Sequence, residues 1–141
     1  TKYITGTDGE KMSKSKNNII NIFVDNKTLR NQIMKIETRS LSVEDPKNPQ
    51  ECNVFKLYEF IASRNEVESL KKQYLKGGIG YGTAKELLFD KILSRFSKNR
   101  KKYFELLEDR SELENLLSGG SERARVQAQK VLKRVRSRIG F

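Results

Sequence analysis

Lys11-Met12-Ser13-Lys14-Ser15 is the stretch from which the rest of this chain can be interpreted. A glycine-bearing segment, Gly6-Thr7-Asp8-Gly9-Glu10, precedes it, and Lys16 follows directly. Three ammonium groups beside two hydroxyls can neutralise several phosphates, because each lysine acts as a mobile point charge. The stretch therefore predicts a phosphate-binding loop. From composition alone, the alternative is a solvated basic turn, since short basic motifs also arise by chance.

Beyond residue 24 the pattern changes to apolar residues at helical spacing. This spacing predicts an all-α fold, a bundle of about five or six helices with short connections, preceded by the non-helical loop. We therefore expect two parts, residues 1–24 as loop and linker and residues 25–141 as a helical domain. The expected helices cover roughly residues 26–38, 52–63, 65–76, 83–108, 111–118 and 121–141.

Local signals set these expected boundaries. Asp25 or Asn26 is a candidate N-cap for the first helix, and Pro46 and Pro49 predict a surface loop over residues 39–50. Three capping boxes predict helix starts, namely Asn65–Glu68, Thr83–Glu86 and Ser111–Glu114. Two glycine pairs predict helix ends, namely Gly77-Gly78 and Gly119-Gly120. The last helix is expected to bury the stripe Ala124, Ala128, Val131, Val135 and Ile139.

The formal charge of +11 is concentrated in two segments. Residues 91–102 carry six basic and no acidic side chains, and residues 119–141 carry seven basic and one acidic. Focused positive charge favours polyanionic partners, although a merely solvated face is the alternative. Arg100 does not fit the basic side of the expected fourth helix. The candidate nucleic-acid contacts are Lys91, Arg95, Lys98, Lys102, Arg123, Lys130, Lys133 and Arg134.

The single cysteine and the absence of histidine exclude several kinds of chemistry. Cys52 cannot form an internal disulfide, which fits a reducing cytosol, and a structural thiol near a helix start is favoured over a reactive nucleophile. Without histidine, a zinc site or histidine-based acid-base catalysis is not expected. No apolar run approaches the roughly 18 residues of a membrane span.

The order K-M-S-K-S resembles the second signature of class I aminoacyl-tRNA synthetases. The lead-in from Gly6 to Gly9, the linker 18–23 and the C-terminal segment 121–141 are similar to bacterial tryptophanyl-tRNA synthetases. The resemblance implies that Lys14 and Lys11 act catalytically on the ATP phosphates. Asn18 matches an asparagine often found three residues after the motif. The implied ATP-binding residues are Lys11, Met12, Ser13, Lys14 and Ser15.

The same resemblance implies a cytoplasmic, homodimeric enzyme that activates tryptophan with ATP and transfers it to tRNA-Trp. Magnesium would arrive with the nucleotide, with no protein-bound metal. The helical region would bind the tRNA anticodon end. Because the histidine-rich first signature is absent, we expect a C-terminal part of a longer enzyme, inactive alone, with the tryptophan pocket upstream. The alternatives are the tyrosine enzyme or another class I synthetase, and a stand-alone basic helical RNA-binding module.

Overall fold

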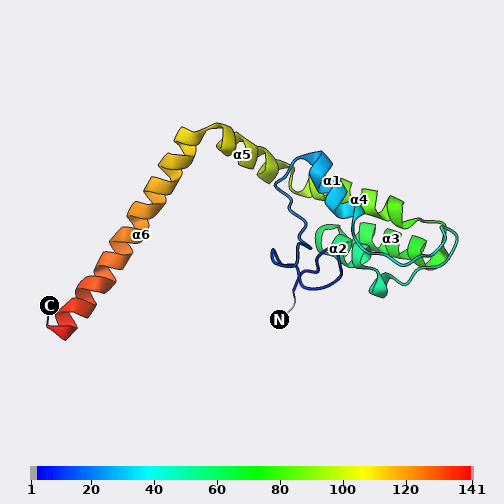
Figure 1. Cartoon of the computed structure of the whole chain (residues 1–141), viewed down its shortest axis with the longest axis horizontal. Helices are drawn as coiled ribbons and strands as arrows, with labels where there is room; N and C mark the ends of the chain where they lie inside the picture. The colour runs from blue at the N-terminus through cyan, green and yellow to red at the C-terminus, as the bar shows by residue number, and fades with distance from the viewer. Residues whose placement is uncertain (1–2, 141) are drawn as a thin grey trace. The chain divides into compact units, whose positions relative to one another are not determined.

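The computed structural model describes residues 3–140, and the predicted all-α fold class is confirmed (Figure 1). Within these residues there is no strand, only an isolated antiparallel bridge between Thr5 and Lys11. The chain forms two compact units, Thr1–Arg100 and Lys101–Phe141. The helices are α1 (Asn26–Met34), the short 3-10 helix η1 (Pro49–Glu51), α2 (Asn53–Ile61), α3 (Arg64–Lys76), α4 (Tyr81–Arg95), α5 (Ser97–Glu108) and α6 (Arg110–Ile139).

The first unit is built around α4, which packs against both α1 and α2. Apolar residues at helical spacing form one core, as the sequence pattern predicts. Cys52 is buried at the N-cap of α2, and its Sγ lies 3.4 Å from the hydroxyl of Tyr74. Burial raises the pKa of the Tyr74 hydroxyl. The fully or almost fully buried members of this core include Leu29, Ile33, Val54, Phe55, Leu70, Tyr74, Ala84 and Leu88.

In the first unit the starts of α1 and α2 are correctly anticipated, and those of α3 and α4 are wrong. Asp25 caps α1 as expected, because its Oδ1 accepts from the Thr28 amide at 2.9 Å. The box expected at Asn65–Glu68 lies two residues earlier, at Ser63 and Glu66. The box expected at Thr83 is absent, because α4 already begins at Tyr81 after Gly80. Two box patterns compete at the start of α3, whereas α4 begins after Gly80 without a side-chain cap.

The prediction of a single helix over residues 83–108 is wrong, because the helix is interrupted at Phe96, between α4 and α5. Phe96 has φ −105° and ψ 12°. Beyond the break, Arg100 is 7% exposed and donates to the carbonyl of Ile22 and to Oδ1 of Asn26. Arg100, which did not fit the basic side of a single helix, therefore ties the start of α5 to the linker after the KMSKS stretch.

The second unit departs furthest from expectation. Helix α6 begins after Asp109, whose Oδ1 accepts from the Glu112 amide at 2.9 Å, so the box expected at Ser111 is not used. It then runs continuously through Gly119-Gly120, where a break was expected. Each glycine in a helix interior costs only about 1 kcal/mol relative to alanine. Phe141, part of the C-terminal resemblance, lies outside the described residues.

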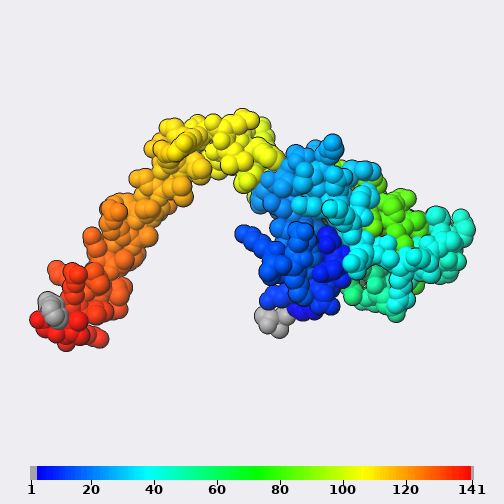
Figure 2. All heavy atoms as spheres, viewed as in Figure 1, coloured from blue at the N-terminus to red at the C-terminus, as the bar shows by residue number. Residues whose placement is uncertain are grey.

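The stripe expected to be buried in the last helix is exposed. None of the described residues of α6 is buried, and its atoms form a rod one helix wide in Figure 2. All five stripe residues are accessible, namely Ala124, Ala128, Val131, Val135 and Ile139. The apolar periodicity marks a face that can pack, but periodicity does not supply the partner.

The loop between α1 and η1 is folded around a buried lysine. Lys47 is 1% exposed, and its Nζ donates to the carbonyls of Ser42, Val43 and Asp45 at 2.8, 3.2 and 2.8 Å. The amide of Lys47 also donates to the carbonyl of Tyr74 at 2.6 Å. Three carbonyl acceptors satisfy the ammonium, as burial of a charge requires. The loop expected from its two prolines is thus fixed onto the end of α3.

Gly77 lets that loop approach α3, so its replacement by alanine should destabilise the first unit strongly. Gly77 has φ +81° and ψ 179°, and an added Cβ would lie 2.1 Å from the carbonyl oxygen of Glu44. We expect a loss of about 3 kcal/mol in the free energy of unfolding. The measurement is urea unfolding followed by near-UV circular dichroism, which reports buried Tyr74 in a chain without tryptophan.

Gly78→Ala is the matched control. Gly78 also has a positive φ, +90°, but nothing lies within 4 Å of its added Cβ. Gly78→Ala should lower the free energy of unfolding by only about 1 kcal/mol. Equal losses for the two variants would contradict the proposed contact at Gly77.

Candidate functional site: the KMSKS loop and the basic helices

The KMSKS loop, defined here as residues 6–18, begins with a tight backbone turn. The amide of Gly6 donates to the carbonyl of Glu10 at 2.7 Å, and the amide of Met12 donates to Ile4 at 2.9 Å. Gly9 has φ +79°, a conformation that glycine adopts without strain. The turn therefore brings residues 4–6 alongside residues 10–12 before the chain reaches the lysines.

The side chain of Asn18 holds the loop from inside. Asn18 is 2% exposed. Its Nδ2 donates to both carboxylate oxygens of Asp8, at 2.8 and 3.0 Å, and to the carbonyl of Lys11 at 3.1 Å. Its Oδ1 accepts from the amide of Ser13 at 2.8 Å. One neutral amide thus binds the backbone on both sides of Met12.

Asp8 and Gly6 complete this arrangement. The hydrogen bond from Asn18 is the main cause of a lowered pKa for the Asp8 carboxyl, so this group stays ionised. An added Cβ at Gly6 would lie 2.4 Å from Cγ of Asn18, which leaves no room for a larger residue. From the sequence, Gly6 and Asp8 are only part of the segment that precedes the K-M-S-K-S stretch, whereas the structure shows both in contact with Asn18.

Two contacts fasten the KMSKS loop to the helices. The Nδ2 of Asn53, at the start of α2, donates to the carbonyl of Gly6 at 2.6 Å. The amide of Glu37, beyond the end of α1, donates to the carbonyl of Thr7 at 2.8 Å. No local sequence signal identifies Asn53, because its partner lies 47 residues away.

The structure brings the five predicted ATP-loop residues together with different exposures. Lys11 and Lys14 are exposed, and neither forms an ion pair within residues 3–140. Ser13 Oγ and Ser15 Oγ lie 2.8 Å apart. Met12 is half-buried, beside an apolar hollow that includes Ile20 and Leu57. The loop therefore presents free ammonium groups on a restrained backbone, which is the arrangement that an anion site requires.

The predicted basic face is distributed over two helices, with Lys91 and Arg95 on α4 and Lys98 and Lys102 on α5. Its charges are not equivalent. Lys91 Nζ lies 2.7 Å from Glu66, and Lys102 Nζ lies 2.6 Å from Glu112. Both glutamates come from other helices, so inspection of the face alone could not reveal them.

The remaining predicted nucleic-acid contacts carry unpaired charge. Arg95 and Lys98 form no ion pair in the part of the chain that the structure describes. The same holds for the exposed α6 residues Arg123, Lys130, Lys133 and Arg134.

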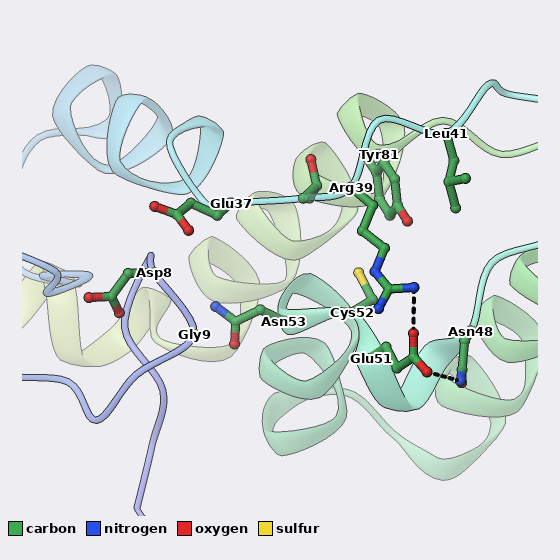
Figure 3. A pocket seen from close by; sticks show the side chains of 11 residues that line it. Asp8, Gly9, Glu37, Arg39, Leu41, Asn48, Glu51, Cys52, Asn53 and Tyr81 are labelled. Carbon is green, nitrogen blue, oxygen red and sulfur yellow. Dashed lines mark hydrogen bonds and ion pairs between the residues drawn. The ribbon is translucent and has the colours of Figure 1, made fainter.

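A cavity of about 300 Å³ opens beside the KMSKS loop (Figure 3). Asp8, Glu37 and Glu51 contribute carboxylates to its lining, and Arg39 contributes a guanidinium that lies 2.7 Å from Glu51. The excess of negative charge disfavours a polyphosphate there. No local sequence pattern predicts this cavity, because its lining combines residues from 8 to 81.

Residues 3–140 contain neither a membrane-spanning helix nor a cluster of metal-ligating side chains. No helix in residues 3–140 is long and apolar enough to cross a membrane. Over the same residues, no three histidine, cysteine, aspartate or glutamate side chains gather as they would around a metal ion.

Comparison with known proteins defines the class of this chain. Residues 1–97 match the model of the family described as "tRNA synthetases class I (W and Y)". This match covers more than half of the chain and includes the whole KMSKS loop. The chain belongs to this family of class I tRNA synthetases.

Within the family, the similar proteins are tryptophan enzymes. Tryptophan--tRNA ligases of Campylobacter jejuni (strain RM1221) and Rhodopirellula baltica are 42% and 40% identical over 98% of this chain. A crystal structure of tryptophanyl-tRNA synthetase from Campylobacter jejuni matches 99% of this chain with a TM-score of 0.90 and 41% identity. Another, complexed with ADP and tryptophan, has a TM-score of 0.91. This chain spans 43% of both ligases and 45% of the first structure.

The Lys91–Glu66 pair gives a pH prediction. Hydrogen bonds from Lys91 first, then from Ser63, lower the pKa of the Glu66 carboxyl from 4.5 to about 2. Because the folded pKa lies below the unfolded one, this contribution to stability is present above pH 4.5 and is lost as the pH falls toward 2. A carboxyl-detected NMR titration should place Glu66 well below the ordinary glutamate range.

Replacing Lys91 with methionine removes the main cause of that shift. The pKa of Glu66 should then move up toward 4.5. Glu68, an exposed neighbour on α3, is the internal reference in the same spectra. An unchanged Glu66 titration in the variant would show that the ion pair is absent in solution.

Proposed function

We propose that this chain is the part of a tryptophan--tRNA ligase that carries the ATP-phosphate loop and the tRNA-binding helices. The observation that carries the proposal is the KMSKS loop itself, in which Lys11 and Lys14 have no ion pair with any described residue while Asn18 restrains the backbone at Lys11 and Ser13. Identity of about 40% with tryptophan--tRNA ligases over 98% of the chain supports the choice of amino acid.

The proposed reaction has two steps. Tryptophan attacks the α-phosphate of ATP, forming tryptophanyl-adenylate and releasing pyrophosphate, and the tryptophanyl group then moves to the 3′ end of tRNA-Trp. Lys14, with Lys11, stabilises negative charge on the β- and γ-phosphates as the bond to the α-phosphate breaks. Ser13 and Ser15 provide hydroxyl donors beside them. Magnesium enters as part of the ATP substrate and needs no resident site on this chain.

In this proposal residues 1–24 complete the catalytic domain and residues 25–141 bind the anticodon end of the tRNA. The tryptophan pocket belongs to the length of the relatives that this chain does not span, so the chain alone should not catalyse ATP–pyrophosphate exchange. The complete enzyme would work in the cytoplasm as a homodimer. We call this chain, joined to that tryptophan-binding segment, the complete enzyme.

The family model covers both tryptophan and tyrosine enzymes, and the two share the KMSKS chemistry proposed here. The preference for tryptophan rests on the ligases that resemble this chain over nearly its whole length. Pyrophosphate exchange by the complete enzyme with each amino acid in turn decides between them. Exchange driven by tyrosine and not by tryptophan would reverse the assignment.

Lys14→Ala in the complete enzyme should lower the rate of ATP–pyrophosphate exchange about a hundredfold or more. The KM for tryptophan should change little, because the ammonium acts on phosphates and contributes to the transition state. The matched control is Lys72→Ala, at an exposed lysine of α3 that pairs with no acidic residue in positions 3–140. An exchange rate equal to that of the control would remove the KMSKS loop from the mechanism.

The unpaired charges of α4 and α5 should contribute most to tRNA binding by the helical part. Replacing Arg95 and Lys98 together with alanine should weaken binding to a tRNA-Trp transcript. It should also make the slope of log K against log salt shallower by about 1 to 2. Lys72→Ala with Lys76→Ala removes the same charge from exposed positions of α3. Equal effects of the two double variants would mean that net charge alone attracts the tRNA.

A further inference from the structure

We infer that Asn18 is a positioning residue for the reaction, because its carboxamide fixes the backbone that carries Lys11 and Lys14. This inference rests on the proposed function, and it adds a specific residue whose side chain does not itself need to touch ATP. The hydrogen bonds, the burial and the packing of Asn18 each support this role.

All four polar contacts of the Asn18 carboxamide are made inside the KMSKS loop. Its Nδ2 has acceptors in the Asp8 carboxylate and the Lys11 carbonyl, and its Oδ1 has a donor in the Ser13 amide. At 2% exposure, water does not replace these partners readily. The amide therefore fixes residues 11 and 13, and with them the direction in which the chain enters Lys14.

The backbone and surroundings of Asn18 are equally constrained. Its carbonyl accepts from the amide of Thr7 at 2.9 Å. Gly6 lies so close that a Cβ there would be 2.4 Å from both Cγ and the carbonyl oxygen of Asn18. Asp8, in turn, accepts from the Glu10 amide at 2.9 Å. The carboxamide thus cannot rotate away without breaking contacts on both sides of the loop.

Only a side-chain amide satisfies this set of partners. The carboxylate of Asp8 and the carbonyl of Lys11 need a donor, whereas the amide of Ser13 needs an acceptor. Aspartate offers no donor when ionised and would place a second negative charge beside Asp8. A lysine-rich loop held by a neutral amide keeps its ammonium groups available and still avoids much of the ordering cost of binding.

The test exchanges the side chains of Asp8 and Asn18, which are hydrogen-bonded to each other. In the complete enzyme, Asn18→Asp should reduce kcat/KM for ATP in pyrophosphate exchange about thirtyfold, since donors to two acceptors are lost and two carboxylates meet. The KM for tryptophan should stay within about twofold. Adding Asp8→Asn restores a donor to the residue-18 carboxylate and should recover about tenfold of the loss. The carbonyl of Lys11 remains without its donor, so recovery is incomplete.

A second readout reports the loop without any activity. In the 141-residue chain, hydrogen exchange of the Ser13 amide should speed up at least about tenfold in Asn18→Asp and slow again in the double variant. Exchange of the Leu29 and Leu88 amides, in the core helices α1 and α4, should stay unchanged if the effect is confined to the loop. If Asn18→Asp does not fold, Asp8→Ala removes one partner at a less buried position and should give the same pattern with smaller changes.

The outcomes separate this inference from the proposed function. If Lys14→Ala abolishes exchange but Asn18→Asp and Asp8→Ala retain wild-type kinetics for ATP, the positioning inference is overturned and the function stands. A fall in activity that the double variant does not reverse also overturns it, as does equal loss of protection at Ser13 and in the core helices. If Lys14→Ala is fully active, the proposed function fails, whatever happens to the Ser13 amide.

Discussion

The contact on which the site depends is the set of hydrogen bonds made by the buried carboxamide of Asn18. A loop rich in lysine has no intrinsic reason to adopt one conformation, because its charges repel one another and its glycine permits many backbone states. Asn18 supplies that reason by joining Asp8, Lys11 and Ser13 inside a space that only Gly6 can border. The lysines then need no ion pairs to be ordered, and their charge stays available for phosphates.

Neutral amides recur wherever this loop and its linker meet the helices. Asn53 binds the carbonyl of Gly6, and Asn26 receives the guanidinium of Arg100, which also binds the carbonyl of Ile22. These bonds connect the KMSKS loop to α2 and its linker to the first turn of α5. Backbone carbonyls and side-chain amides therefore provide the mechanical support. Surface charges contribute little to stability in comparison, because water and salt screen them.

The charge of +11 overstates the positive surface available to a polyanion. Glu66 and Glu112 already neutralise Lys91 and Lys102, and Arg39 is paired with Glu51 beside the cavity. Among the candidate nucleic-acid contacts in residues 3–140, Arg95, Lys98 and the four candidates on α6 have no ion pair.

The sequence by itself determined the features that depend on neighbouring residues. Helical periodicity predicted the all-α class and Asp25 predicted the start of α1, whereas the phosphate-binding role of K-M-S-K-S stays a prediction. Local rules work there because a cap or a periodic face needs only residues a few positions apart. They failed where two local solutions are nearly equal in energy, as at the competing capping boxes near Ser63 and Asn65, or where glycine only weakens a helix, as in α6. The break at Phe96, the buried ammonium of Lys47 and the bonds of Asn18 also became visible only in the folded chain, because no local rule selects one backbone path there. Tertiary structure alone decided the burial of Arg100 and the partner of Asn53, because these contacts join groups distant in sequence that meet only after folding.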